Sequence, residues 1–333
     1  MMYDKKKSLR SYLINFIAFI IIFFVVWLLI EVKIIDRYYQ RILLTILISM
    51  VLSVSLNLTT GALGEMVLGH AGFMAIGAYT SSLFVMYSGM DNLLGLIIGI
   101  LLGGLASALI GMLVGIPALR IRGDYLAIVT LGFGEIIRSL LEYFKFTGGA
   151  MGLSGIPYLV DLKVALVITI ISLVIIFAFM RSRTGRAIKA IREDEIASIS
   201  MGIPVTFYKT LAFSVSAFFA GVAGAMFAFS NGTLIPSTFT FNYSIEILVI
   251  VVLGGIGSFT GSIVAAVFVS FLPEVLLSLQ MYRYIIYAVI LFLTMLIRPT
   301  GLLDSKEFSL VKCLDKLLSW MRLKLRKRGK ENG

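Results

Sequence analysis

The sequence has very few of the side chains that most enzymes and metal proteins use. Its 333 residues include one cysteine, Cys313, and one histidine, His70. A single cysteine excludes a disulfide bond within the chain, and the two residues together offer no cysteine or histidine cluster for zinc. One histidine also leaves no pair for separate acid and base roles. The sequence therefore predicts that the chain is not an enzyme and holds no metal.

Charged residues are scarce as well. They form 14% of the chain, compared with about 25% in soluble domains, whereas hydrophobic residues form 59% and the mean hydropathy is +1.00. Repeated apolar runs of about 20 residues are typical of transmembrane helices. The composition thus predicts an all-α, polytopic transmembrane helical bundle.

The net charge is +11, but the basic residues are unevenly distributed. They gather at the N-terminus, between Arg181 and Lys209, and in the tail that follows Arg298. Cytoplasmic segments of membrane proteins carry such an excess, so we attribute the charge to membrane orientation with both termini in the cytoplasm, and not to nucleic-acid binding. The phosphate-binding pattern GxxxxGK[ST] is missing, so we expect the chain itself to bind no ATP and no other cofactor.

Apolar runs predict the spans. The first run, 12–30, has no charge and as a helix measures about 28 Å, which suffices to cross a bilayer and is too long for a signal-peptide core. Further runs are 42–58, 66–86, 93–119, 123–144, 164–180, 210–229, 245–253, 262–279 and 284–297. Crossing by all of them gives about ten spans, which we favour, and re-entrant pieces near the end give eight.

This plan divides the chain into two parts. Residues 1–303 form the transmembrane domain, with a cytoplasmic loop at 181–209. Residues 304–333 carry an apolar stripe between basic residues, which predicts an amphipathic cytoplasmic helix lying on anionic membrane lipid.

Glycines occur in two kinds of setting. Gly95, Gly99 and Gly103 repeat at intervals of four within 93–119, and this pattern favours close packing of helices. The stretch 56–79 instead mixes glycines with polar residues, which favours a broken or re-entrant helix next to a cavity. The run 245–253 is also interrupted by glycines after about 14 Å of helix, a pattern that indicates a transport site.

These two stretches supply the candidate translocation path. It comprises Gly61, Gly64, Glu65, His70, Gly72, Gly77, Tyr79, Glu135, Gly254, Gly255 and Gly257. Other interpretations stay open for single members. His70 is explained equally by a structural hydrogen bond, and Glu135 by a structural ion pair with Arg138 three residues later.

The segment from Arg181 to Lys209 is the most polar part of the interior. Its apolar spacing predicts one amphipathic helix over 185–201, capped by Thr184 and ended by Gly202 and Pro204. Such a helix between two spans is a candidate docking element for a soluble partner, although an ordinary basic loop explains the charge equally well. The candidate docking residues are Arg183, Gly185, Arg186, Ala187, Arg192, Glu193, Asp194, Glu195, Ala197 and Gly202.

Several motifs occur in a fixed order along the chain: LNLTTGALGEMVLGHAGFMAIGAY, RGDYLAIVTLGFGEIIR, TGGAMGLSGIP, GRAIKAIREDEIASISMGI, LAFSVSAFFAGVAGAMFA, GGIGSFTGSIVAA and RPTGLL. Together they resemble the LivM-type membrane permeases of branched-chain amino-acid ABC importers, from about Leu56 to Leu303. In one departure, Gly202 follows Glu195-Ile196-Ala197 one position later than the common importer pattern has it.

The resemblance implies a permease subunit in a bacterial or archaeal cell membrane. It implies a translocation pathway for leucine, isoleucine and valine formed with a second related permease, and an extracytoplasmic substrate-binding protein that delivers the solute. Two ABC ATPase subunits that use ATP and Mg would dock onto the 181–209 loop. Relatives of similar pattern also suggest urea, amides or other amino acids as substrates. An ion-coupled secondary transporter is the rival class, but few ionisable residues lie within the spans.

Overall fold

The computed structural model describes residues 36–119, 121, 123–276, 282–297 and 301–302. Residues Tyr38–Lys306 belong to one compact unit, and the account below concerns this unit alone. The span expected at 12–30 and the tail expected at 304–333 lie outside the described residues.

The described residues are mostly helical, as the composition predicts. The helices are α2 (Arg37–Asn57), α3 (His70–Ser88), α4 (Leu93–Ala118), α5 (Asp124–Tyr143), α6 (Leu162–Arg181), α7 (Arg183–Glu193), α8 (Glu195–Ser200), α9 (Val205–Asn231), α10 (Phe241–Gly254), α11 (Phe259–Val275) and α12 (Arg283–Ile297). Short turns are η1 (Leu58–Leu63), η2 (Lys145–Thr147), η3 (Gly149–Met151) and η4 (Pro236–Thr238).

Among the described residues, five helical segments are long and apolar enough to cross a membrane. They are Arg37–Leu63, Leu93–Ala118, Leu162–Arg181, Val205–Asn231 and Pro236–Gly254. Helix α11 is apolar but shorter. The helical, multi-pass character of the chain is therefore confirmed, while the number of ten spans stays a prediction.

Helix α4 is apolar all round, and residue size decides which side faces inward. Its glycines are buried, whereas Leu101, Leu105, Leu109 and Leu113 are 50–66% exposed along one stripe. Leucine loses nothing by facing lipid, and glycine lets a neighbouring backbone approach. The small-residue face therefore packs inward and the leucine stripe is left for lipid.

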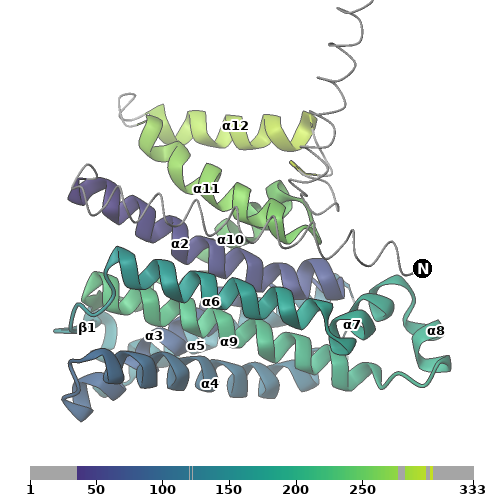
Figure 1. The fold of residues 1–333 in the computed structure, drawn as a ribbon, viewed down its shortest axis with the longest axis horizontal. Helices are drawn as coiled ribbons and strands as arrows, with labels where there is room; N and C mark the ends of the chain where they lie inside the picture. The colour runs from purple at the N-terminus through teal and green to yellow at the C-terminus, as the bar shows by residue number, and fades with distance from the viewer. Residues whose placement is uncertain (1–35, 120, 122, 277–281, 298–300, 303–333) are drawn as a thin grey trace, which may run out of the picture. The chain divides into compact units, whose positions relative to one another are not determined.

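Helices α3, α4 and α9 form the core of the unit, and α4 and α9 lie side by side (Figure 1). A Cβ atom added at Gly77 in α3 would meet the backbone of Gly221 in α9, and one at Gly103 in α4 would lie 2.6 Å from the carbonyl oxygen of Gly77. Ser107 donates a hydrogen bond to the Phe73 carbonyl at 2.8 Å. The packing predicted for Gly103 is therefore confirmed.

A short antiparallel ribbon lies at the end of the helices opposite to α7 and α8 (Figure 1). Strand β1 (Leu153–Ser154) precedes α6, and strand β2 (Thr233–Leu234) follows α9; Leu153 pairs with Leu234. Since α7 and α8 connect the other ends of α6 and α9, the 181–209 loop and the ribbon mark the two faces of the bundle.

The 181–209 loop differs from the single helix predicted for it. Helix α7 ends at Glu193, and α8 is a separate helix because Asp194 adopts an extended backbone and its carboxylate accepts the Ala197 N–H at 2.9 Å. An acidic side chain in this position is a strong N-cap. The prediction of Thr184 as the first cap was wrong as well, since Ser182 accepts the Gly185 N–H.

Candidate functional site

The first helix break lies between α2 and α3. Helix α2 continues into the wider π-helical turn η1, which ends where Gly64 takes the left-handed backbone with φ of 85°. Residues 64–69 are then not helical, and α3 begins only at His70 instead of the predicted residue 66. The predicted interruption in 56–79 is confirmed, and we call residues Leu58–Gly69 the first break.

The second helix break lies between α10 and α11. Helix α10 ends at Gly254, Gly255 and Gly257 have φ of 107° and 92°, and α11 begins at Phe259. Only glycine adopts such backbone angles without strain. The predicted interruption by glycines is confirmed here too, and we call residues Gly255–Ser258 the second break.

Asn57 joins the two breaks. This buried side chain accepts a hydrogen bond from the Gly257 N–H at 2.9 Å and donates to the Ser258 carbonyl at 2.9 Å and to the Ser262 hydroxyl at 2.9 Å. An asparagine amide can form four hydrogen bonds, and Asn57 forms three of them with residues about 200 positions away in sequence. The last turn of α2 therefore holds the second break against the first.

The 181–209 loop reaches the same place. Arg192, in the last turn of α7, donates from Nη1 to the carbonyl oxygen of Gly61, and a Cβ added at Gly257 would lie 2.8 Å from that same nitrogen. Lys209, in the first turns of α9, pairs with Glu65 at 2.7 Å and with Glu195 at 3.3 Å. We call Gly61, Glu65, Arg192, Glu195, Lys209 and Gly257 the junction cluster.

The charges of the junction cluster balance. The cluster holds two cations and two carboxylates: both carboxylates pair with Lys209, and Arg192 donates to the Gly61 carbonyl. The side chains of Lys209 and Glu65 are only 7% and 15% exposed. Buried ions are tolerated when each has an opposite charge and hydrogen bonds. The cluster is therefore a neutral, tightly tied connection between the loop and both breaks.

The remaining predicted docking residues lie on α7, on α8 and in the turn after α8. Gly185 is buried against the Met180 backbone, and Arg186 donates to the Arg181 carbonyl at 3.0 Å. Gly202 is exposed, with φ of 77°. The other members, Arg183, Ala187, Glu193, Asp194 and Ala197, are exposed or half-buried. The structure thus leaves most of this set accessible, and Arg192, which is exposed as well, also donates to the Gly61 carbonyl.

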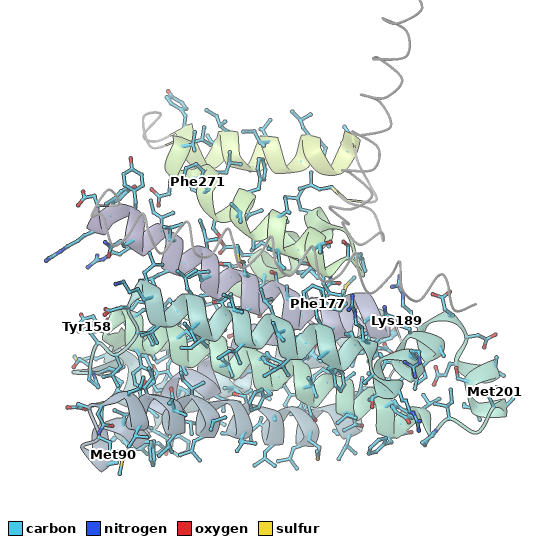
Figure 2. The ribbon with its side chains drawn as sticks, viewed as in Figure 1. Met90, Tyr158, Phe177, Lys189, Met201 and Phe271 are labelled. Carbon is cyan, nitrogen blue, oxygen red and sulfur yellow. The ribbon has the colours of Figure 1, made fainter. Side chains whose placement is uncertain are left out.

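Apolar side chains at the tip of the loop were not among the predicted docking residues. Ile196, Ile199 and Met201 are 75%, 57% and 82% exposed, and Figure 2 shows Met201 beyond α8 at the far end of the loop. Within α8, only Ser198 is buried. The sequence indicates this surface, because these apolar residues lie within a segment too polar to enter the membrane.

Asn57 and Lys209 were also missed as members of a site. Each interrupts or borders a long apolar run: Asn57 is the one amide in 42–58, and Lys209 is a lone cation before 210–229. A polar group in such a position needs a partner. The sequence signalled the need but not the partners.

Four members of the predicted path lie on α3, in contacts with neighbouring elements of the bundle. His70 Nε2 is 2.9 Å from the Ser55 hydroxyl, and the Tyr79 hydroxyl donates to the Leu234 carbonyl at 3.3 Å. Gly72 faces Gly134 of α5, and Gly77 faces Gly221 of α9. All four are buried and belong to α3, whereas Gly61, Gly64, Glu65 and Gly257 lie at the breaks. None of these placements tests a role in translocation.

Glu135 lies in α5, next to the start of α10. Its carboxylate accepts from Arg138 Nε at 2.7 Å and from the Phe241 N–H at the start of α10 at 3.0 Å, and Arg138 also pairs with Glu142. The structure therefore contains the ion pair that the spacing suggested, with its side chains about one quarter to one third exposed.

The last two predicted path residues adjoin the second break. Gly254 packs on the backbone of Gly261, and Gly255 lies against Gly301, where Leu302 donates its N–H to the Leu253 carbonyl at 2.7 Å. Across the described part of the chain, no group of three or more His, Cys, Asp or Glu side chains is placed to hold a metal ion.

Sequence comparison identifies relatives of this chain. The family profile described as "Branched-chain amino acid transport system / permease component" matches residues 38–297. The chain is 41% identical to the high-affinity branched-chain amino acid transport permease LivM of Salmonella typhimurium over 283 residues, and 40% identical to LivM of Escherichia coli over the same length. Each match covers 74% of this chain and 66% of the relative, so the chain spans about two thirds of these relatives.

A second kind of permease from the same transport system is related more distantly. LivH of Escherichia coli is 30% identical over 145 residues, which is 42% of this chain and 46% of LivH. The chain is therefore similar in sequence to two different permeases that share one system name.

Proposed function

The chain belongs to the family of permease components of branched-chain amino acid transport systems, and on this premise we propose that it is the membrane-spanning permease subunit of an ABC importer for leucine, isoleucine and valine. The observation that carries the proposal is the 41% identity to LivM across 74% of the chain. The apolar helices agree with such a role, since a permease must enclose a path through lipid.

The proposal includes the partners. A second permease of the LivH kind completes the pathway, two ABC ATPases hydrolyse ATP with Mg, and an extracytoplasmic binding protein delivers the amino acid. This chain is the transport subunit and performs no hydrolysis. The accessible face of the 181–209 loop, with its charged residues and the apolar tip of Ile196, Ile199 and Met201, supports docking of the ATPases there.

The mechanism follows from how the loop is attached. ATP binding would draw the two ATPases together and displace α7 and α8. Because Arg192 and Lys209 tie the loop to the breaks, this displacement reaches the spans and alternates the opening of the path between the two faces. Gly61, Gly64 and Gly257 would then be the places where the backbone bends.

Reconstitution of the complete complex tests the function. Proteoliposomes that contain both permeases and both ATPases should accumulate radiolabelled leucine when ATP is inside and the binding protein is outside, and excess isoleucine or valine should compete. Competition by urea or amides instead would reassign the substrate. Uptake that follows an ion gradient without ATP hydrolysis would overturn the importer class.

Orientation has its own test. With Cys313 replaced by serine, single cysteines in the 148–155 loop should react with an impermeant maleimide added to intact cells, because this loop lies on the β1–β2 face that we assign to the outside. A cysteine at Lys189 should react only in inverted vesicles. The opposite pattern would invert the topology and remove the loop from the ATPases.

A further inference from the structure

One arginine occupies the space left by glycines from both breaks. The Nη1 atom of Arg192 would lie 2.8 Å from a Cβ on Gly257, and its Cγ atom would lie 3.1 Å from a Cβ on Gly64. At the same time Nη1 donates to the Gly61 carbonyl. A larger residue at Gly257 would displace the guanidinium, and one at Gly64 would press on the aliphatic part of the Arg192 side chain. These two glycines therefore leave room for the arginine in addition to adopting positive φ angles.

The chemistry of the contact suits an arginine. The carbonyl groups in the last turn of a helix have no N–H partner within that helix, and they carry the negative end of its dipole. Gly61 lies in the last turn of η1, so a cation with several donors stabilises this end of the first break. A neutral side chain of similar length would give up the charge interaction.

The same residue is fixed to the loop from the other side. Arg192 lies in the last turn of α7, and Glu195 follows it at the start of α8, where Lys209 ties Glu195 to Glu65. Asn57 then links the first break to the second. A displacement of α7 therefore reaches both breaks through Arg192 at once.

We propose that Arg192 is the coupling residue of the permease: it transmits movement of the 181–209 loop to both helix breaks, and it does not serve as a contact for the ATPase. The proposal rests on the proposed function as an ATP-driven importer. It assigns Arg192 a positioning role within the chain, since the guanidinium of this exposed residue donates to the Gly61 carbonyl of the first break.

The test separates coupling from assembly. In the reconstituted complex, Arg192→Ala should co-purify with the ATPases and keep ATP hydrolysis within about twofold of wild type. The number of leucine molecules taken up per ATP should fall at least roughly tenfold, the size expected when a hydrogen bond to a charged group is lost. Arg192→Lys should recover part of the ratio because one ammonium still reaches the Gly61 carbonyl.

Lys189→Ala is the matched control, because Lys189 is an exposed cation on the same helix (Figure 2). It should keep the wild-type ratio of uptake to hydrolysis. Arg192→Gln, which retains a neutral donor, covers the case in which the alanine variant fails to accumulate, and its ratio should lie between those of Arg192→Ala and Arg192→Lys.

Three results would overturn the proposal. The first is wild-type rates of both hydrolysis and uptake in all Arg192 variants. The second is loss of ATPase co-purification, which would make Arg192 a docking contact. The third is an equal fall of hydrolysis and uptake, which would indicate a structural role alone. Failure of the proposed function looks different, since the wild-type complex would then show no ATP-dependent uptake.

Discussion

Glycine performs opposite tasks in two regions of this protein. Between α3, α4 and α9, glycines such as Gly77 and Gly221 keep ordinary helical angles and let the backbones touch. At the two breaks, Gly64 and Gly257 have positive φ and leave room for the side chain of Arg192. The first region is locked by close packing, whereas the second is held by a few hydrogen bonds and ion pairs.

The difference teaches what glycine content means in a membrane protein. In the packed region, glycine has no Cβ, so the helix backbones come into van der Waals contact that lipid cannot replace. At the breaks, backbone groups lack helical hydrogen-bonding partners, and side chains from distant segments form hydrogen bonds with them instead. A movement of the 181–209 loop is therefore expected to change the breaks and leave the packed helices intact.

The largest effect should come from breaking the ties of the second region. Lys209→Ala removes the ammonium that pairs with Glu65 and Glu195, and removal of one partner from a buried pair costs about 3–5 kcal/mol. We expect a clear fall in the midpoint of thermal unfolding in detergent. The double variant Lys209→Met with Glu65→Gln should regain much of it, and a single variant as stable as wild type would show that packing alone holds the junction cluster.

Gly77→Ala probes the packed region with a single methyl group. The added Cβ would meet the Gly221 backbone, which cannot rotate away, so we expect a destabilisation at the upper end of the overpacking range, about 3 kcal/mol. Yield and thermal midpoint should fall, while uptake per folded complex stays close to wild type. Full stability of this variant would contradict the contact between α3 and α9.

Gly257→Ala places the same methyl group at the second break. A positive φ is strained for alanine by about 1–3 kcal/mol, but the neighbouring atom belongs to the flexible Arg192 side chain, which can shift. We expect a smaller loss of stability than for Gly77→Ala and a larger loss of leucine uptake per ATP. Equal effects of the two variants on uptake would erase the distinction between the regions.

Gly132→Ala should have the smallest effect. Gly132 lies within α5, and no atom is within 4 Å of a Cβ built there. Alanine favours the helix over glycine by about 0.5–1 kcal/mol, so the thermal midpoint should stay or rise slightly. A marked loss of uptake in a stable Gly132→Ala complex would instead show that this face of α5 contacts another subunit or the solute.

Much of the fold follows from local rules. The apolar runs at 93–119 and 164–180 agree with α4 and α6 within two residues, because about 20 apolar residues have no better state than a helix in lipid. Both breaks were also predictable, since clustered glycines and polar atoms interrupt those runs.

The errors came where one short-range signal competed with another. The apolar spacing in 185–201 predicted one helix, but the capping carboxylate of Asp194 divides it into α7 and α8. The family resemblance, carried by motifs in order, agreed with the comparison to LivM. The predicted path and docking residues could be proposed from composition, but their grouping could not.

The sequence by itself determined the membrane class, most of the helices, the two interruptions at glycines and the family, because each depends on neighbouring residues or on motifs read in order. Only the tertiary structure decided which glycines pack helices and which make room for Arg192. The reason is distance along the chain: Arg192 and Gly61 are 131 residues apart, and Asn57 and Gly257 are 200 apart. No local pattern encodes such a contact, since a polar residue in an apolar run indicates that it has a hydrogen-bonding partner but not which residue that partner is.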